Sequence, residues 1–280
     1  CWAGETMRIG GRDFDTENGV YIMGILNLTP DSFSDGGRWT ERDAALRQAA
    51  RMASEGAAII DLGGESTRPG HTPVGAAEEA ERVLPMVEAV KRETGLPVSV
   101  DTYKYETARL ALEAGADMIN DVWGLKYDAG EMARVIAGSG AACCLMHNRA
   151  RAEYAHLMPE LLHDLRETLR IADAAGIARG KIILDPGVGF GKSYEQNLAV
   201  LNRLEELRVL GLPVLLGASR KSVVGLTLGL PVDERLEGTL ATTAIGVLKG
   251  AAFIRVHDVR ENLLAAKMAL AIRREAGFGG

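Results

Sequence analysis

The chain has 280 residues, of which 47% are hydrophobic and 25% are charged, a balance typical of a folded globular enzyme. Its formal net charge of -6 argues against a general nucleic-acid-binding protein, although a local basic pocket for a small anion is compatible with it. Aromatic residues make up only 5%, so Ala, Val, Leu and Ile must supply most of the core.

The three cysteines form neither a disulfide framework nor a metal-binding spacing. Cys143 and Cys144 are adjacent in an apolar run, and we expect them to be small buried side chains on opposite faces of a strand. No apolar run reaches 18 residues and no signal peptide is evident, so we expect a cytoplasmic protein.

Short apolar runs recur along the chain and predict eight strands. In order, these are Tyr21–Leu26, Ile59–Leu62, Val98–Asp101, Met118–Asn120, Ala141–Met146, Ile182–Asp185, Val214–Leu216 and Phe253–Val256. Continuous apolar runs that alternate with helices indicate parallel strands that are covered on both faces.

Apolar residues at three- and four-residue spacing predict helices between these strands. The clearest are Arg42–Glu55, Ala76–Thr94, Tyr105–Ala114, Pro159–Ala175, Tyr194–Val209 and Val259–Ala276. Several of them stop at a glycine before the next strand, as at Gly56, Gly95, Gly115 and Gly211. The segment 221–250 is too long for one helix, and Pro231 indicates a short helix, a break, and then a second helix over Thr239–Leu248.

Eight strand–helix units in one chain predict an α/β fold of the (β/α)8 TIM-barrel type. A doubly wound open sheet is the alternative, but it usually has fewer strands at this length. We expect one barrel domain over residues 20–280. Residues 1–19 are expected to form an N-terminal extension and a small hairpin that covers the barrel floor.

Active sites of such barrels lie at the carboxyl ends of the strands, and these ends are unusually polar. In chain order they carry Asn27, Asp61, Asp101, Asn120, Met146 with His147, Asp185, the segment from Ser219 to Ser222, and Arg255 with His257. A polar surface loop, helix N-caps or a buried ion pair would each explain single members of this set. They do not explain why Arg68, Lys221, Arg255 and His257 gather at the same end.

The residue types indicate the ligand class. Asp101, Asn120 and Asp185 on separate strands can line a pocket for a flat heterocycle with several N–H donors, such as a pterin or guanine. The basic residues Arg68, Lys221, Arg255 and His257 suit an anion such as phosphate. Oxygens of Asn27 and Asp35 can hold Mg2+, which usually works alongside substrate phosphates.

Two features of the sequence resemble other kinds of binding site. The segment DPGVGFGKS (Asp185–Ser193) ends like a P-loop, but the first glycine position is Pro186. We interpret it as a flexible strand-to-helix loop, with Phe190 available to cover an aromatic substrate. His147, His156 and His163 have no cysteine pattern that would complete a zinc site, and we expect surface or helix-contact histidines.

Seven segments together resemble the signature segments of the dihydropteroate synthase family, in order and in spacing. They are NLTPDSFSDGG, DLGGESTRPG, SVDTYK, INDVWG, DPGVGFGK, GASRKS and RVHDV, and the resemblance runs from about residue 20 to about residue 265. It implies a TIM-barrel transferase that joins 6-hydroxymethyl-7,8-dihydropterin diphosphate to p-aminobenzoate in folate biosynthesis, the pathway that sulfonamides block. The products would be 7,8-dihydropteroate and pyrophosphate.

The resemblance also implies roles for individual residues. The pterin would be held by Asp101, Asn120, Met146, Asp185, Lys221 and Arg255; the diphosphate by Asn27, Arg68, Arg255 and His257; Mg2+ by Asn27 and Asp35; and p-aminobenzoate by Phe33, Ser34, Thr67, Arg68, Pro69, Phe190, Lys221 and Ser222. The catalytic set would be Asp101, Asp185, Lys221, Arg255 and His257. A homodimer packed through helices is expected, with no nucleic-acid or membrane partner.

The chemistry of the residues favours an SN1-like path. Diphosphate leaves well once Mg2+, Arg255 and His257 neutralise its charge, and Asp101 and Asp185 favour the positive pterin methylene that remains. We expect residues 28–38 and 63–72 to form loops that close over the diphosphate and exclude water. One alternative is a pterin-binding methyltransferase domain on the same fold, but it has no need for Arg68, the SRKS segment or the Arg255/His257 pair. A second is a non-catalytic pterin-binding protein, which should have lost Asp35, Thr67 or Arg68, and all three are present.

Overall fold

The computed structural model describes residues 6–28, 38–65 and 73–275 and contains an eight-stranded parallel sheet wrapped into a barrel. Its strands are β3 (Tyr21–Asn27), β4 (Ile59–Gly63), β5 (Val98–Asp101), β6 (Met118–Asp121), β7 (Ala142–Met146), β8 (Ile182–Asp185), β9 (Leu215–Leu216) and β10 (Phe253–Val256). Each predicted strand agrees with an observed one to within one residue at either end.

Hydrogen bonding runs around the sheet in the order β8-β7-β6-β5-β4-β3-β10-β9. A parallel bridge between Leu184 and Val214 connects β8 to the chain entering β9 and so brings the two ends of the sheet together. The structure is therefore a (β/α)8 barrel, and the doubly wound alternative is wrong.

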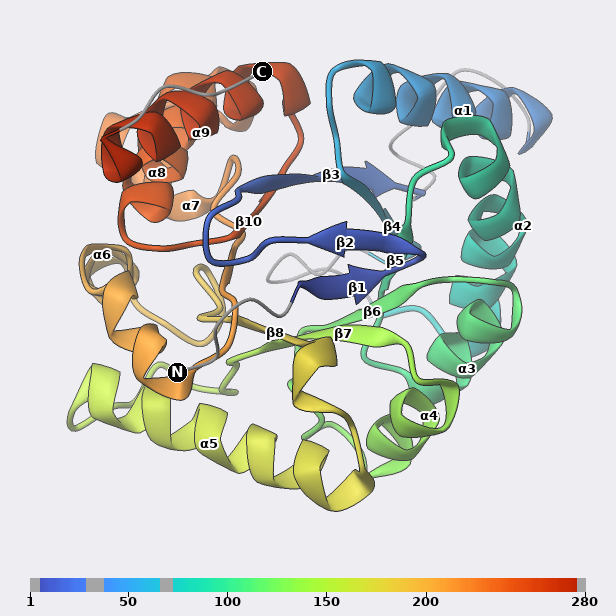
Figure 1. The fold of residues 1–280 in the computed structure, drawn as a ribbon, viewed down its shortest axis with the longest axis horizontal. Helices are drawn as coiled ribbons and strands as arrows, with labels where there is room; N and C mark the ends of the chain where they lie inside the picture. Colours follow the sequence, from blue (N-terminus) through green and yellow to red (C-terminus); the bar gives the residue numbers. More distant parts are fainter. Residues whose placement is uncertain (1–5, 29–37, 66–72, 276–280) are drawn as a thin grey trace.

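Nine described α-helices surround the barrel, as Figure 1 shows. They are α1 (Arg38–Ser54), α2 (Ala76–Thr94), α3 (Tyr105–Glu113), α4 (Glu131–Ser139), α5 (Leu157–Ala175), α6 (Tyr194–Asn202), α7 (Ser222–Leu228), α8 (Leu236–Leu248) and α9 (Val259–Arg274). Helix α4 is additional to the clearest predicted helices. The predicted break near Pro231 is confirmed, since α7 and α8 are separate helices there.

The predicted helix Tyr194–Val209 is wrong in its second half, where the chain forms a 3-10 helix over Leu204–Leu210. Leu204, Leu207 and Leu210 are buried and recur every three residues, which matches the three residues per turn of a 3-10 helix. The predicted stops at glycine are confirmed at all four positions; Gly211, for example, ends this segment with φ of 68°, a left-handed conformation that favours glycine.

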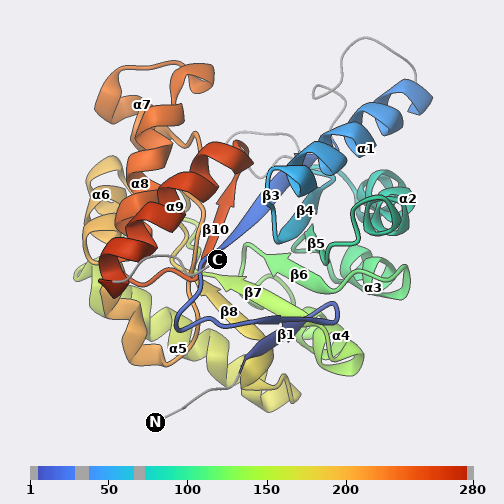
Figure 2. The same ribbon diagram turned by 45° about the horizontal axis from the view of Figure 1, so that its top comes forward.

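A two-stranded antiparallel hairpin, β1 (Met7–Ile9) and β2 (Arg12–Phe14), lies across one end of the barrel, in front of the strands in Figure 1. Met7, Ile9 and Phe14 are buried in one cluster with barrel residues such as Phe253. Figure 2 shows that α7 lies at the opposite end. The end covered by the hairpin is thus closed by apolar packing, which leaves the other end for a site.

The core has two main layers of apolar side chains. An inner cluster fills the barrel and includes Cys144, and an outer cluster between strands and helices includes Cys143. Both cysteines are fully buried and point to opposite faces of β7, as predicted.

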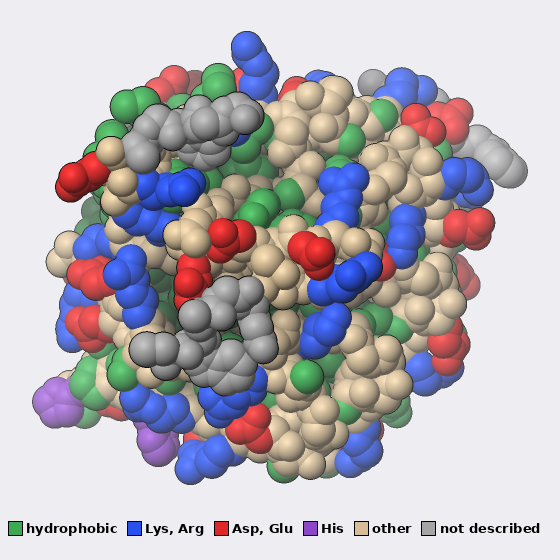
Figure 3. Space-filling view, viewed as in Figure 1, with side chains coloured by type: hydrophobic (Ala, Val, Ile, Leu, Met, Phe, Trp, Pro, Cys, Tyr) green, Lys and Arg blue, Asp and Glu red, His purple; other side chains and the backbone are tan. Residues whose placement is uncertain are grey.

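Acidic and basic side chains are interspersed over the face with the hairpin (Figure 3). No described helix combines the length and the apolar character needed to cross a membrane.

Candidate active site

Strand alternation carries polar side chains into the barrel above the inner apolar cluster. Ile59, Met118, Ile183 and Phe253 belong to that cluster, and the residues two positions later on the same strands are Asp61, Asn120, Asp185 and Arg255. Because side chains two residues apart share one face of a strand, the same inward face changes from apolar to polar toward the carboxyl ends.

The Arg255 guanidinium joins two acidic strands at the centre of this polar layer. Its Nε donates to Asp61 Oδ2 at 2.6 Å, and one terminal nitrogen donates to Asp101 Oδ2 at 2.7 Å. Asn120 Nδ2 lies 3.5 Å from Asp61 Oδ2, at the limit of a hydrogen bond. Burial lowers the pKa of Arg255, but the carboxylates of Asp61 and Asp101 raise it, and the pKa lies above its ordinary value.

Both carboxylates keep a second oxygen without a protein partner. Among the residues that the structure describes, three buried side-chain oxygens accept or donate no hydrogen bond: Asp61 Oδ1, Ser99 Oγ and Asp101 Oδ1. Burial raises the pKa of Asp101 to about 7 against the pull of Arg255. An unpartnered polar atom in a buried site is costly, so these oxygens indicate a place for a ligand with hydrogen-bond donors.

Asp185 and Lys221 form the opposite wall of the layer. Asp185 Oδ1 accepts from the backbone N–H of Gly187 at 2.7 Å, and burial raises the pKa of this carboxyl. Burial also lowers the pKa of Lys221 to about 8, which Asp185 partly opposes. The Lys221 ammonium donates to the carbonyl of Val188 at 2.5 Å.

An apolar cluster flanks the polar groups. Tyr103, Val122 and Met146 are buried together, with Trp123 and Phe190 packed against them. Met146 pairs with Asp185 in the sheet register, and the Lys221 ammonium lies 4.7 Å from the centre of the Phe190 ring. A flat ring system thus finds polar acceptors and an apolar surface side by side.

The remaining predicted residues that are described lie around the same end. Asn27 ends β3 and is half-buried, Ser222 begins α7 and is exposed, and His257 follows β10 with its Nδ1 2.9 Å from Ser219 Oγ in a hydrogen bond. The structure therefore gathers Asn27, Asp101, Asn120, Met146, Asp185, Phe190, Lys221, Ser222, Arg255 and His257 at the carboxyl ends of the strands.

Six predicted residues lie outside the described ones: Phe33, Ser34, Asp35, Thr67, Arg68 and Pro69. Most of the two loops that are expected to close over the diphosphate also lies there. These predictions stay predictions.

Asp61 appears among the polar strand ends in the sequence but has no role in the predicted site. Its side chain is fully buried and contacts both Arg255 and Asn120. The signal was present in the sequence, since Asp61 has the same inward parity as Ile59 on β4 and interrupts an otherwise apolar strand.

The loop after β8 is held by its own lysine, and its predicted flexibility stays a prediction. Lys192 donates to the carbonyls of Gly187 and Phe190, each at 3.0 Å, so it binds its own loop and is not available to a phosphate as a P-loop lysine is. His147 is buried against Asp164 of α5, which confirms a helix contact, whereas His156 and His163 are exposed. No group of three described His, Cys, Asp or Glu residues has the arrangement of a metal site.

Comparison with known proteins agrees with this geometry. Residues 23–257 match the model of the pterin binding enzyme family. The chain is 55% identical over 263 residues to the dihydropteroate synthase of Clostridium beijerinckii, covering 94% of this chain and 97% of the relative. It is 51% identical over 256 residues to that of Bacillus subtilis, covering 91% and 90%.

Solved structures of dihydropteroate synthases share the fold of this chain. A Clostridium difficile dihydropteroate synthase crystallised in the presence of pteroic acid has a TM-score of 0.90 at 51% identity, covering 92% of this chain and 98% of that one. The Xanthomonas albilineans enzyme with 4-aminobenzoic acid has a TM-score of 0.90 at 40% identity, covering 96% and 99%. The chain thus belongs to the pterin binding enzymes and, within them, to the dihydropteroate synthase family.

Proposed function

We propose that the protein condenses 6-hydroxymethyl-7,8-dihydropterin diphosphate with p-aminobenzoate, giving 7,8-dihydropteroate and pyrophosphate in folate biosynthesis. The observation that carries the proposal is the pair of buried carboxylate oxygens on Asp61 and Asp101 that have no protein partner beside Arg255. A pterin presents several N–H donors, whereas a ligand without them would leave these oxygens unpaired. The relatives crystallised with pteroic acid or 4-aminobenzoic acid support the same substrates.

The pterin half of the substrate would occupy the polar layer. Hydrogen-bond acceptors come from the carboxylates of Asp101 and Asp185, and a side-chain amide comes from Asn120. Lys221 provides a positive charge near Asp185. Met146 would pack against the ring, with Phe190 at its edge.

The diphosphate would lie toward Asn27, Arg255 and His257, with Arg68 as a further predicted contact. Asn27 offers an amide oxygen of the kind that Mg2+ prefers, and Gly63, its partner in the sheet register, has no side chain beside that oxygen. These features fit a magnesium ion held by Asn27, by the predicted ligand Asp35 and by substrate oxygens. Such an ion would supply positive charge to the leaving diphosphate.

The chain's own groups fit an SN1-like reaction. Loss of diphosphate leaves a positive pterin methylene, which the carboxylates of Asp101 and Asp185 stabilise electrostatically in a buried site. The arylamine nitrogen then attacks this carbon and releases a proton, so no protein nucleophile is required. Phe190, Lys221 and Ser222 border the side of the site where p-aminobenzoate would enter, together with the predicted residues Phe33, Ser34, Thr67, Arg68 and Pro69.

A homodimer is part of the proposal, supported by an exposed apolar face on α7, α8 and α9. Large apolar side chains are exposed there on all three helices: Leu226, Leu228, Ile245, Leu248, Leu264, Met268 and Ile272. Patches of this kind mark protein interfaces. Sedimentation velocity should give a dimer for the wild type and a monomer for Leu264→Glu/Met268→Glu; a monomeric wild type would contradict the dimer.

The reaction is tested by pyrophosphate release from the pterin diphosphate with Mg2+, with and without p-aminobenzoate. We expect release that rises with the arylamine, yields dihydropteroate and falls at least 100-fold in Lys221→Ala and Asp185→Ala, a loss of the size expected for removing a transition-state contact. Lys181→Ala, at the opposite end of β8, is the matched control and should retain activity. Tight pterin binding without release would contradict the proposal.

The methyltransferase alternative is disfavoured because the chain has the segment SRKS and the Arg255/His257 pair, and because its relatives are named synthases. The expected cytoplasmic location stays a prediction.

A further inference from the structure

The loop between β8 and α6 is built around the side chain of Lys192. The Lys192 ammonium donates to the carbonyl oxygens of Gly187 and Phe190 and to His147 Nδ1, each at 3.0 Å. An ammonium has three N–H donors and no acceptor, so these three acceptors satisfy all of its hydrogen-bonding capacity. A side chain that would be expected to reach solvent instead holds two carbonyls of its own loop.

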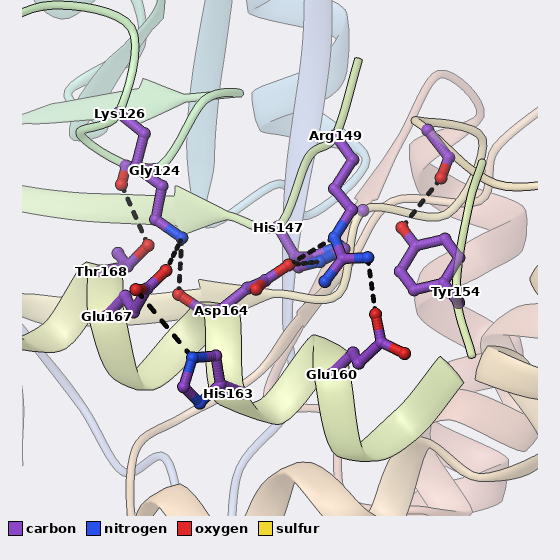
Figure 4. A network of polar contacts seen from close by, with 12 residues as sticks. Gly124, Lys126, His147, Arg149, Tyr154, Glu160, His163, Asp164, Glu167 and Thr168 are labelled. Atoms are coloured by element: carbon purple, nitrogen blue, oxygen red, sulfur yellow. Dashed lines mark hydrogen bonds and ion pairs between the residues drawn. The ribbon is translucent and has the colours of Figure 1, made fainter. Parts of the chain in front are cut away.

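The third contact fixes the state of His147. Asp164 is ionised and can only accept, so Nε2 of the imidazole carries the proton that is donated to Asp164 at 3.0 Å. Burial lowers the pKa of His147 to about 4, so the ring is neutral at pH 7 and its Nδ1 accepts from Lys192. Asp164 also accepts from Arg149 Nε at 2.7 Å, and His147 and Arg149 together hold the pKa of Asp164 below its usual range although burial raises it. Figure 4 shows His147 and Arg149 pointing toward Asp164 on α5.

The chain after β7 packs on the same loop at two further points. Tyr154 Oη donates to the carbonyl of Gly191 at 2.8 Å (Figure 4 labels Tyr154). A Cβ atom at Gly187 would lie 1.9 Å from the carbonyl oxygen of His147, and one at Gly191 would lie 2.3 Å from that of Arg149. The two loops thus touch backbone to backbone, and only glycine fits at the contact.

The same loop presents its other side to the polar layer. The N–H of Gly187 donates to Asp185, the carbonyl of Val188 accepts from Lys221, and the Phe190 ring lies beside the Lys221 ammonium. Lys192 binds the carbonyls of Gly187 and Phe190 in this same loop. Moving this loop would therefore move the partners of both Asp185 and Lys221.

We propose that Lys192 is a positioning residue for the pterin site: by holding the loop after β8 against His147, it sets the orientation of Asp185, Phe190 and Lys221. The inference rests on the proposed function. None of the contacts of Lys192 reaches Asn27, Ser219 or His257, which border the proposed diphosphate position. Its loss should therefore weaken binding of the pterin and spare binding of the pyrophosphate.

The test compares Lys192→Met with Lys181→Met by isothermal titration of 6-hydroxymethylpterin and, separately, of inorganic pyrophosphate with Mg2+. Lys181 is the matched control, because it also donates to a backbone carbonyl, that of Arg8 at 2.9 Å, but at the other end of the same strand. We expect Lys192→Met to weaken pterin binding by about 10- to 100-fold, because the loop that holds the partners of Asp185 and Lys221 loses three hydrogen bonds, with pyrophosphate binding within about twofold of wild type. Lys181→Met should bind both ligands like the wild type.

A milder variant keeps the proposal testable if Lys192→Met does not fold. Tyr154→Phe removes one hydrogen bond to the same loop and leaves no buried charge, and it should weaken pterin binding by up to about tenfold. Equal loss of both ligands, or unchanged pterin binding with only a lower melting temperature, would overturn the positioning role. A wild type that binds pterin but releases no pyrophosphate would contradict the proposed function and leave this test intact.

Discussion

Two buried polar clusters lie on the same side of the barrel and differ in how their hydrogen bonds are satisfied. In the first, Arg255 joins Asp61 and Asp101, and each carboxylate keeps one oxygen without a partner. In the second, Lys192, His147, Asp164 and Arg149 form a chain, and none of their side-chain atoms is among the described buried atoms without a partner. The unpaired oxygens support the proposal that the first cluster binds a ligand, and the satisfied contacts support the proposal that the second holds the first in place.

The largest expected effect comes from removing the cation of the first cluster. Arg255→Met leaves Asp61 and Asp101 buried without their partner, and the free energy of unfolding should fall by about 3–5 kcal/mol at pH 8. Urea unfolding measures this, and adding Asp61→Asn should recover part of the loss. Pyrophosphate release should be abolished in both variants.

An exposed pair provides the control for that experiment. Arg109 bonds Glu113 at 2.7 Å on the surface of α3, and Arg109→Met should change the free energy of unfolding by no more than about 0.5 kcal/mol. If Arg255→Met were as mild as Arg109→Met, the first cluster would not depend on Arg255 to pair its buried carboxylates.

The second cluster should make the free energy of unfolding depend on pH through His147. Burial lowers the pKa of His147 to about 4. Between about pH 6.5, the ordinary value, and pH 4, the unfolded chain binds a proton at His147 that the folded chain does not, so the contribution of His147 to the free energy of unfolding falls as the pH falls. The raised pKa values of the buried carboxyls Asp101 and Asp121 act in the opposite direction over the same range, so the variant is compared with the wild type. The loss from His147 over this range should approach about 3 kcal/mol, and His147→Gln should remove that part of the slope in urea unfolding between pH 4.5 and 7. An unchanged slope in His147→Gln would show that another group is responsible.

A smaller effect is expected in the pH dependence of pterin binding, which should depend on the first cluster. The pKa of Asp101 is raised to about 7 by burial, so this carboxyl is protonated and loses acceptor capacity below that pH. Affinity for 6-hydroxymethylpterin should fall by about tenfold per pH unit below pH 7. Asp101→Asn should bind more weakly at pH 8 but without this dependence; a dependence that persists in Asp101→Asn would assign it to a different group.

The sequence predicts the first cluster better than the second for a physical reason. Strand periodicity and the rule that barrel sites lie at strand carboxyl ends need only local pattern, and they place Asp101, Asn120, Asp185 and Arg255 at one end. The roles of His147 and Lys192 depend on which way a loop folds. Gly187, Gly189 and Gly191 all have positive φ and curl the loop around Lys192, and no pattern in the segment states that the lysine points inward.

Other differences have similar causes. The 3-10 segment Leu204–Leu210 has an apolar spacing of three, which an α-helix with a narrow apolar face shares, so the spacing alone does not decide between them. Asp61 follows the inward parity of β4, yet its importance depends on the contact with Arg255, which is 194 residues away in the chain. Contacts across the barrel of this kind follow from closure of the sheet.

The most direct test of the central claim is a crystal structure with 6-hydroxymethylpterin bound. The account predicts that N–H groups of the ring lie within hydrogen-bond distance of Asp101 and Asp185, that Asp101 Oδ1 gains a donor, and that the contacts of Lys192 to Gly187, Phe190 and His147 are unchanged. A ring bound elsewhere, or a complex in which Asp101 Oδ1 still has no donor, would contradict it.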